Sequence, residues 1–331
     1  METDPLLYSS LFLPRHGSAW RHKKERRKNM KKKTKVKKYR RIDYMGLVYI
    51  APWLLGFLLL QLYPFLSSLF YSFTDYQFFN EPSFVGLKNY IKLFTTDPEF
   101  YNSLKVTIVY TLYTVPGKLM MALFIAVLLN KNIKRIGLIR TVYYLPSLFG
   151  GSVAVAILWK LLFMDDGAIN NILLTLHLPK VQWLGNSSTA LMTICLLEIW
   201  QFGSSMVMFL AALKQVPASL YEAASLDGAG KVKSFFHITL PQISPIIFFN
   251  IIMQTITALQ NFTSSFVVTG GGPNKGTYVL GMKLYTDAFT YFKMGYASAT
   301  SWVIFGLILV VTLLLFRFSS GKVYYEDGGD F

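Results

Sequence analysis

Six long apolar windows, separated by polar or charged segments, dominate the pattern of the sequence. Each window is long enough to cross a hydrocarbon core of about 30 Å as a helix. A helix is the expected form because lipid offers no hydrogen-bond partner to an open backbone. We predict an all-α polytopic membrane protein with six transmembrane helices. The windows are residues 45–73, 104–129, 142–163, 189–213, 246–268 and 296–318.

The second window is interrupted in its middle by Pro116, Gly117 and Lys118. This interruption is compatible with a kink, a re-entrant bend or a helix packed inside protein. We count the window as one span.

The composition agrees with a membrane protein, because 53% of the 331 residues are hydrophobic and only 15% are charged. The single cysteine, Cys195, falls within a predicted span, which excludes an internal disulfide and a cysteine-based metal cluster. The histidines at 16, 22, 177 and 237 have no metal-ligand spacing, so we expect no metal site.

The net charge of +16 comes mainly from a basic run at residues 15–41. Such a run ahead of a first span orients the chain and attracts anionic lipid headgroups. Nucleic-acid binding is the alternative, which we disfavour because no aromatic interleaving or folded module accompanies the run. Both termini are therefore expected in the cytoplasm. We divide the chain into a disordered basic tail (1–41), a six-span transmembrane domain (42–320) and a short cytoplasmic tail (321–331).

The amino-terminal region does not have the pattern of a cleaved secretory signal, because its basic stretch is long and its apolar window spans fully. We expect no cleavage. Met30 is a possible alternative initiator.

A polar segment, residues 222–241, lies between the fourth and fifth windows. Leu220, Ala223 and Asp227 fall at helical spacing, Gly228 offers a turn, and a second helix fits before Pro241. We predict a helix-turn-helix in a cytoplasmic loop at residues 214–245. Its adjacent small residues allow another surface to approach the backbone, which is typical of a docking segment.

Nine residues of this segment resemble the EAA loop of bacterial ABC importer permeases, which seats in a cleft of the cytoplasmic ATPase. An ordinary interhelical loop is the plainer alternative. The matching residues are Glu222, Ala223, Ala224, Asp227, Gly228, Ala229, Ile238, Leu240 and Pro241.

Further stretches are similar to carbohydrate-uptake permeases of the maltose-importer type, in the order of that family. They include residues 51–53, 84–90, 167–170, 269–274 and 295–299. The resemblance implies a permease in the bacterial cell membrane that works with a second permease, two cytoplasmic ATPases and an extracytoplasmic solute-binding protein. The glycine-rich turn 269–274 is a candidate docking site for the solute-binding protein. The alternative is a tight turn that only reverses the chain.

The sequence holds no Gly-x-x-x-x-Gly-Lys-Ser/Thr run, so the chain lacks a phosphate-binding loop of that kind. The resemblance implies that ATP and Mg are bound by the partner ATPases and that this chain carries neither cofactor nor catalytic residue. The alternative is a membrane-embedded glycosyl transferase or another polytopic membrane enzyme, for which Asp165 and Asp166 are the best carboxylate pair. A receptor or structural membrane protein is a third possibility, but it leaves the loop 214–245 without a use.

The candidate solute site begins with Glu198, the only acidic residue well inside a predicted span, where a carboxylate has to face protein or water. Phe202 and Ser205 follow at i+4 and i+7 and are expected on the same helical face. The fifth window is rich in amides and hydroxyls. Within it, Gln260 and Asn261 coincide with positions where maltose-type permeases touch sugar.

We hypothesise a neutral oligosaccharide as the solute, because an anionic sugar would be repelled by Glu198 unless a lysine or a proton neutralised the site. Lys105, Lys118 and Lys160 also lie in apolar windows. We assign none of them a substrate role, since two lie near span ends, where long side chains reach water, and Lys118 is placed at an interface with another permease.

Overall fold

The computed structural model describes residues 44–78, 80–131 and 135–319, which form helices and one isolated β-bridge between Thr74 and Phe84. Three helices are each long and apolar enough to cross a membrane: Val48–Ser72, Pro98–Leu129 and Met294–Ser319. Three bent helix pairs bring the total to six if each pair is one span. The predicted tails 1–41 and 321–331, including Met30, lie outside the described residues.

The chain divides into two compact units, and the boundary between them in the sequence falls between Gln61 and Leu62. In the first unit, α2 (Tyr44–Phe57) is apolar, and the rings of Trp53 and Phe57 stack with centroids 5.6 Å apart. A short π-helix, η1 (Leu58–Leu62), follows α2 in the sequence. Trp53 is 68% exposed, which is the expected state for a side chain that faces lipid.

The core of the second unit lies around α5 (Pro98–Leu129), on which α9 (Ser187–Trp200), α10 (Gly203–Gln215) and α14 (Ser244–Leu259) pack. The second window is thus one helix, as predicted, and Pro116 lies inside it. A Cβ atom at Gly117 would lie 2.6 Å from the Ile199 side chain. Gly117 therefore allows α5 and α9 to approach closely.

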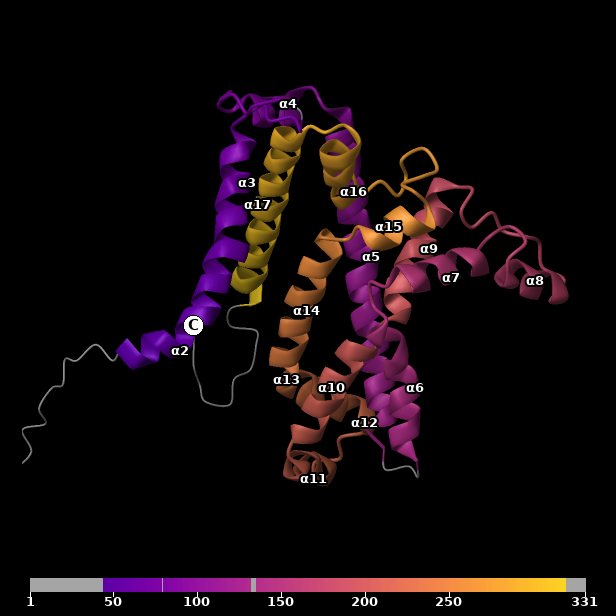
Figure 1. Cartoon of the computed structure of the whole chain (residues 1–331). Coiled ribbons are helices and arrows are strands. Elements are labelled where there is room, and N and C mark those ends of the chain that lie inside the picture. Colours follow the sequence, from indigo (N-terminus) through magenta and orange to yellow (C-terminus); the bar gives the residue numbers. More distant parts are fainter. Residues whose placement is uncertain (1–43, 79, 132–134, 320–331) are drawn as a thin grey trace, which may run out of the picture. The chain divides into compact units, whose positions relative to one another are not determined.

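A second cluster joins α4 (Lys88–Thr95), the start of α5, α16 (Leu280–Tyr285) and α17 (Met294–Ser319). Its buried members are Leu93, Phe100, Leu280, Tyr296 and Ile304. α3 (Tyr63–Ser72) lies beside α17 (Figure 1). The turn η3 (Thr286–Thr290) links α16 to the start of α17.

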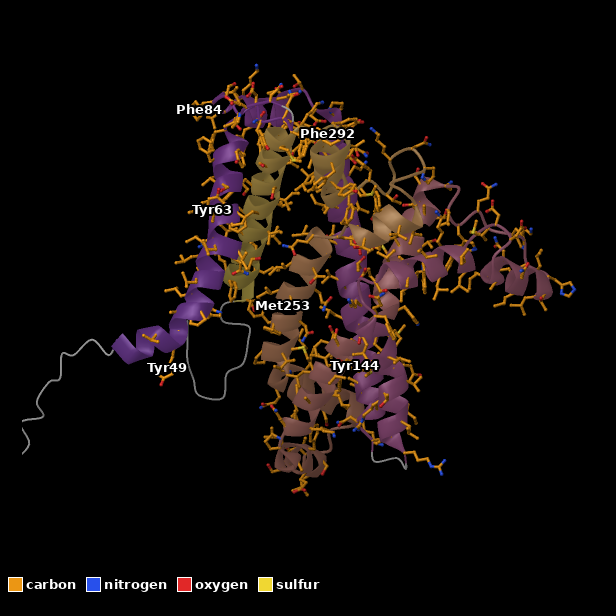
Figure 2. All side chains as sticks on the ribbon, viewed as in Figure 1. Tyr49, Tyr63, Phe84, Tyr144, Met253 and Phe292 are labelled. Carbon is orange, nitrogen blue, oxygen red and sulfur yellow. The ribbon has the colours of Figure 1, made fainter. Side chains whose placement is uncertain are left out.

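Exposed side chains on these helices are often apolar, as Tyr63 and Met253 illustrate (Figure 2). Tyr63 is 68% exposed and Met253 is 46% exposed. Apolar surface of this kind fits lipid or another membrane-spanning chain better than water.

The prediction of a single helix for the third window is wrong. The window divides into α6 (Ile136–Leu148) and α7 (Val153–Leu162), whose axes differ by 100°. The break holds Gly150 and Gly151, and Gly151 has a φ of 71°, a conformation that favours glycine. The short helix α8 (Ala168–Thr175) follows.

The fourth and fifth windows are also broken. α9 and α10 meet at a bend of 43° next to Gln201 and Phe202. The fifth window separates into α14 and α15 (Thr263–Val268) at residues 260–262. Asn261 accepts a hydrogen bond from Ser264 Oγ at 2.7 Å and donates one to Ser265 Oγ at 3.1 Å. Polar side chains that bond locally in this way favour a helix start over a continuous helix.

The segment between α10 and α14 folds as α11 (Ala218–Leu226), a turn, α12 (Lys231–Ser234), the wider turn η2 (Phe235–Thr239) and α13 (Leu240–Gln242). Gly228 has a φ of 74°. Its N–H donates to Ser225 O, and the N–H of Ala229 donates to Ala224 O, which together form a Schellman end of α11. Figure 1 shows α11 and α12 at the opposite end of the second unit from α4 and α16.

Candidate functional site

A cavity of about 330 Å³ lies where α5 and α9 meet the breaks after α6 and α14. Its size is at the lower end of the range for small-molecule sites. Much of its lining is polar, and most polar members offer amide or hydroxyl groups. They are Tyr110, Thr114, Lys118, Ser152, Glu198, Gln201, Gln254, Thr257, Gln260, Asn261, Thr263 and Ser264.

Two charged side chains meet in this cavity. Lys118 Nζ, from α5, lies 3.8 Å from Glu198 Oε2, from α9. The two side chains are 10% and 18% exposed. The close approach of the helices at Gly117 and Ile199 places these charges next to each other.

Three of the five predicted solute residues line the cavity: Glu198, Gln260 and Asn261. Gln260 and Asn261 lie in the break after α14 rather than on a continuous helix, so the break exposes their amides and backbone to the cavity. The assignment of these residues to a solute remains a prediction.

Phe202 and Ser205 do not line the cavity, and the expected stripe with Glu198 is not formed. The helix ends at Trp200 and restarts at Gly203 with a bend of 43°, so i+4 and i+7 spacing no longer means one face. Phe202 is buried with its ring centroid 6.1 Å from that of Tyr143. Ser205 Oγ is buried and accepts a hydrogen bond from Gln254 Nε2 at 3.3 Å.

Lys118 and Gln201 were not predicted as site residues. The sequence contained a signal for Lys118, because an ammonium group in the middle of a span requires a partner, and Glu198 was the available acid. Gln201 had no such signal, since its place in the cavity depends on the helix break.

The nine residues that resemble the EAA loop lie on α11, its terminal turn, η2 and α13. Glu222, Ala223, Asp227, Gly228 and Pro241 are exposed, while Ala224, Ala229, Ile238 and Leu240 are half-buried. The hydroxyls of Tyr221, on α11, and Thr239, on η2, lie 2.8 Å apart and form a hydrogen bond between these two elements.

Residues 218–241 form a helical hairpin, and its tip carries exposed apolar side chains. Leu226 is 89% exposed and Val232 is 72% exposed. Both side chains are therefore available for contact with another surface.

Asp165 and Asp166, the carboxylate pair considered for a membrane-embedded glycosyl transferase, lie in an exposed turn. Asp166 is 91% exposed and accepts a hydrogen bond from Lys180 Nζ at 2.8 Å, which lowers the pKa of Asp166 below its ordinary value. A general acid would need a raised pKa, so Asp166 is not suited to that role. The described residues hold no group of three His, Cys, Asp or Glu side chains that fits a metal ion.

Residues 98–322 match the family described as binding-protein-dependent transport system inner membrane component. The probable ABC transporter permease protein YesP of Bacillus subtilis (strain 168) is 48% identical over 296 residues, covering 88% of this chain and 96% of YesP. The arabinooligosaccharides transport system permease protein AraP of the same strain is 35% identical over 278 residues, covering 82% of this chain and 87% of AraP.

A solved bacterial ABC transporter involved in the import of the acidic polysaccharide alginate has the same fold. One of its chains superposes with a TM-score of 0.74 at 22% identity, covering 84% of this chain and 95% of that chain.

Proposed function

The chain belongs to the binding-protein-dependent transport system inner membrane components, the permeases of ABC importers, and from this premise we propose that its cargo is a neutral sugar or oligosaccharide. The cavity beside Lys118 and Glu198 is the observation that supports this cargo. Its amides and hydroxyls can exchange hydrogen bonds with sugar hydroxyls. Its one positive and one negative side chain compensate each other, so the solute needs no charge of its own.

The name of AraP supports the same class of cargo, since it is a permease for arabinooligosaccharides. Glu198, Gln260 and Asn261 are the proposed solute contacts in this chain. Phe202 and Ser205 are buried outside the cavity, so we assign them a role in packing the helices around the site.

We take the hairpin 218–241 as the docking surface for a cytoplasmic ATPase that binds ATP and Mg. ATP hydrolysis by that subunit then drives transport through this contact. The exposed Leu226 and the Schellman turn at Gly228 support this role. Closure of two ATPases would then move the hairpin, and the helices α10 and α14 that flank it would change access to the cavity.

The remaining partners follow from the same family. A second, homologous permease completes the membrane pore, and an extracytoplasmic binding protein delivers the sugar at the turn 269–274, at the end of the second unit opposite α11 (Figure 1). Both termini are then cytoplasmic.

The test is to purify the chain from its native membrane together with its bound partners. The expected result is a second permease and a nucleotide hydrolase in the complex. The accompanying binding protein is then screened against neutral and acidic sugars by thermal shift, and a neutral oligosaccharide is expected to stabilise it. An enzyme would instead turn over a sugar substrate without a nucleotide hydrolase.

The site is tested with Glu198→Gln in the reconstituted complex. We expect uptake to fall at least about tenfold, which corresponds to about 1.4 kcal/mol. Unaltered uptake and unaltered sugar preference would remove Glu198 from the site.

A further inference from the structure

Lys118 and Glu198 have unused hydrogen-bonding capacity. Within the part of the chain that the structure describes, neither side chain makes a hydrogen bond, and their only polar contact is the 3.8 Å approach to each other. An ammonium group has three N–H donors and a carboxylate has about four acceptor positions. Both groups therefore present free donors and acceptors to the cavity that they line.

This arrangement is costly in a membrane-spanning region. Buried charges without hydrogen bonds lose their hydration, and the attraction between two charges at this distance does not replace it fully. Within the described residues, no hydrogen bond joins either charged group to another cavity residue, and the amides of Gln254 and Asn261 are directed to Ser205, Ser264 and Ser265 instead. The missing partners have to enter from the cavity, as water or as solute.

We propose that Lys118 and Glu198 act together as a clamp for two hydroxyl groups on neighbouring carbons of a sugar ring. This inference rests on the proposed sugar cargo and adds Lys118 as a second specificity residue. One hydroxyl accepts a hydrogen bond from Lys118 Nζ, and the other donates to Glu198. Charge-assisted hydrogen bonds of this type are shorter and stronger than neutral ones, so the clamp selects solutes that offer both hydroxyls at once.

The clamp lies where α5 and α9 pack closely, at Gly117 and the side chain of Ile199. Gly117 next to Lys118 holds α5 against Ile199, the neighbour of Glu198, and leaves no room for even a methyl group without a shift. Because both charges sit on helices held in this way, their spacing is set before a solute arrives.

The test uses four forms of the reconstituted complex: Lys118→Met, Glu198→Gln, the double variant, and Lys105→Met as the control. Lys105 lies on the same helix but is exposed and outside the cavity. Uptake into vesicles is measured with three labelled neutral probes, arabinotriose, maltotriose and lactose, and the melting temperature of each purified complex is recorded.

We expect both single variants to melt lower and to lose uptake, because each leaves an uncompensated charge. The double variant should recover the melting temperature, since it removes both charges, yet its KM for the transported probe should stay raised at least about tenfold. Lys105→Met should resemble the wild type in both measurements.

Recovery of uptake in the double variant would show that the pair only stabilises the fold, and this result would overturn the clamp alone. Lys118→Met with unchanged KM would do the same. A wild-type complex that moves none of the three probes, while its binding protein responds only to non-sugar solutes, would overturn the proposed cargo and the clamp with it.

Discussion

The ammonium group of Lys283 lies 2.6 Å from the carboxylate of Asp97 and 3.0 Å from that of Asp287. Asp97 also caps the first turn of α5 and accepts a hydrogen bond from the hydroxyl of Tyr296. Lys283 is 2% exposed. This network joins the start of α5 to α16, η3 and α17, at the end of the second unit away from α11.

Lys283→Met should destabilise the protein strongly. Removal of one partner leaves two carboxylates near each other without their cation, and breaking a buried ion pair costs about 3–5 kcal/mol. We expect a clear fall in the melting temperature of the detergent-purified protein. Lys293→Met is the control, because Lys293 is exposed, and it should change stability by about 0.5 kcal/mol or less. Equal melting temperatures for both variants would contradict the structural role of the network.

The same variant should change the pH dependence of stability. Burial alone would raise the pKa of Asp97, but the hydrogen bonds from Lys283 and Tyr296 outweigh it and hold that pKa below its ordinary value. Burial raises the pKa of Asp287, against the attraction of Lys283. Without Lys283, the pKa of each carboxyl should rise.

If a carboxyl group has a higher pKa in the folded protein than in the unfolded chain, the folded protein becomes more stable as the pH falls through that pKa. If its pKa is lower in the folded protein, the folded protein becomes less stable as the pH falls. The difference in melting temperature between the wild type and Lys283→Met should therefore shrink from about pH 7 to about pH 5. A difference that stays constant over this range would show that Lys283 acts by packing and not by charge.

Gly228→Val should weaken the attachment of the ATPase. No atom of the chain lies within 4 Å of a Cβ atom at Gly228, but its φ of +74° is a conformation that costs an ordinary residue about 1–2 kcal/mol. Valine would be more strained because it is β-branched. We expect loss of the nucleotide hydrolase on purification, or ATP hydrolysis without uptake.

Gly230→Val is the matched control for this experiment. Gly230 also has free space around its Cα, but its φ is −72° and its ψ is 164°, which valine adopts readily. The control should keep its ATPase. If Gly228→Val transports normally, the turn is not part of the docking surface.

The paired substitution Asp165→Asn and Asp166→Asn should leave uptake unchanged. Both side chains lie in a loop, and Asp166 is 91% exposed in its pair with Lys180. Exposed pairs of this kind contribute about 0–1 kcal/mol. Loss of all activity in this variant, with normal assembly, would revive the enzyme alternative.

The sequence was sufficient for the helical class, the family and the continuity of α5 through Pro116. It also indicated Glu198, because an acid inside an apolar window is costly wherever the helices end. These features depend on composition and on local chemistry, which a single sequence records. The resemblance to ABC importer permeases is confirmed by the match over residues 98–322.

The helix breaks were less accessible to prediction. Gly150 and Gly151 give the 100° bend between α6 and α7, and the local bonds of Asn261 end α14, yet both lie inside windows that are apolar on average. Phe202 and Ser205 lie outside the cavity because of such a break, since the expected common face with Glu198 relied on helical spacing across residues 201–202. The position of Lys118 within a span indicated that it needs a partner, but its contact with Glu198 depends on how α5 and α9 pack.

The docking of the hairpin on an ATPase is the claim on which the transport mechanism depends. It is tested most directly by placing a photoreactive amino acid at Leu226, which is 89% exposed at the tip of the hairpin, and at Leu178, which is 49% exposed after α8, as the control. Illumination of whole cells should link Leu226 to a nucleotide-hydrolysing subunit and should not link Leu178 to it. A crosslink to that subunit from Leu178 alone, or from neither position in a complex that still transports, would contradict the account.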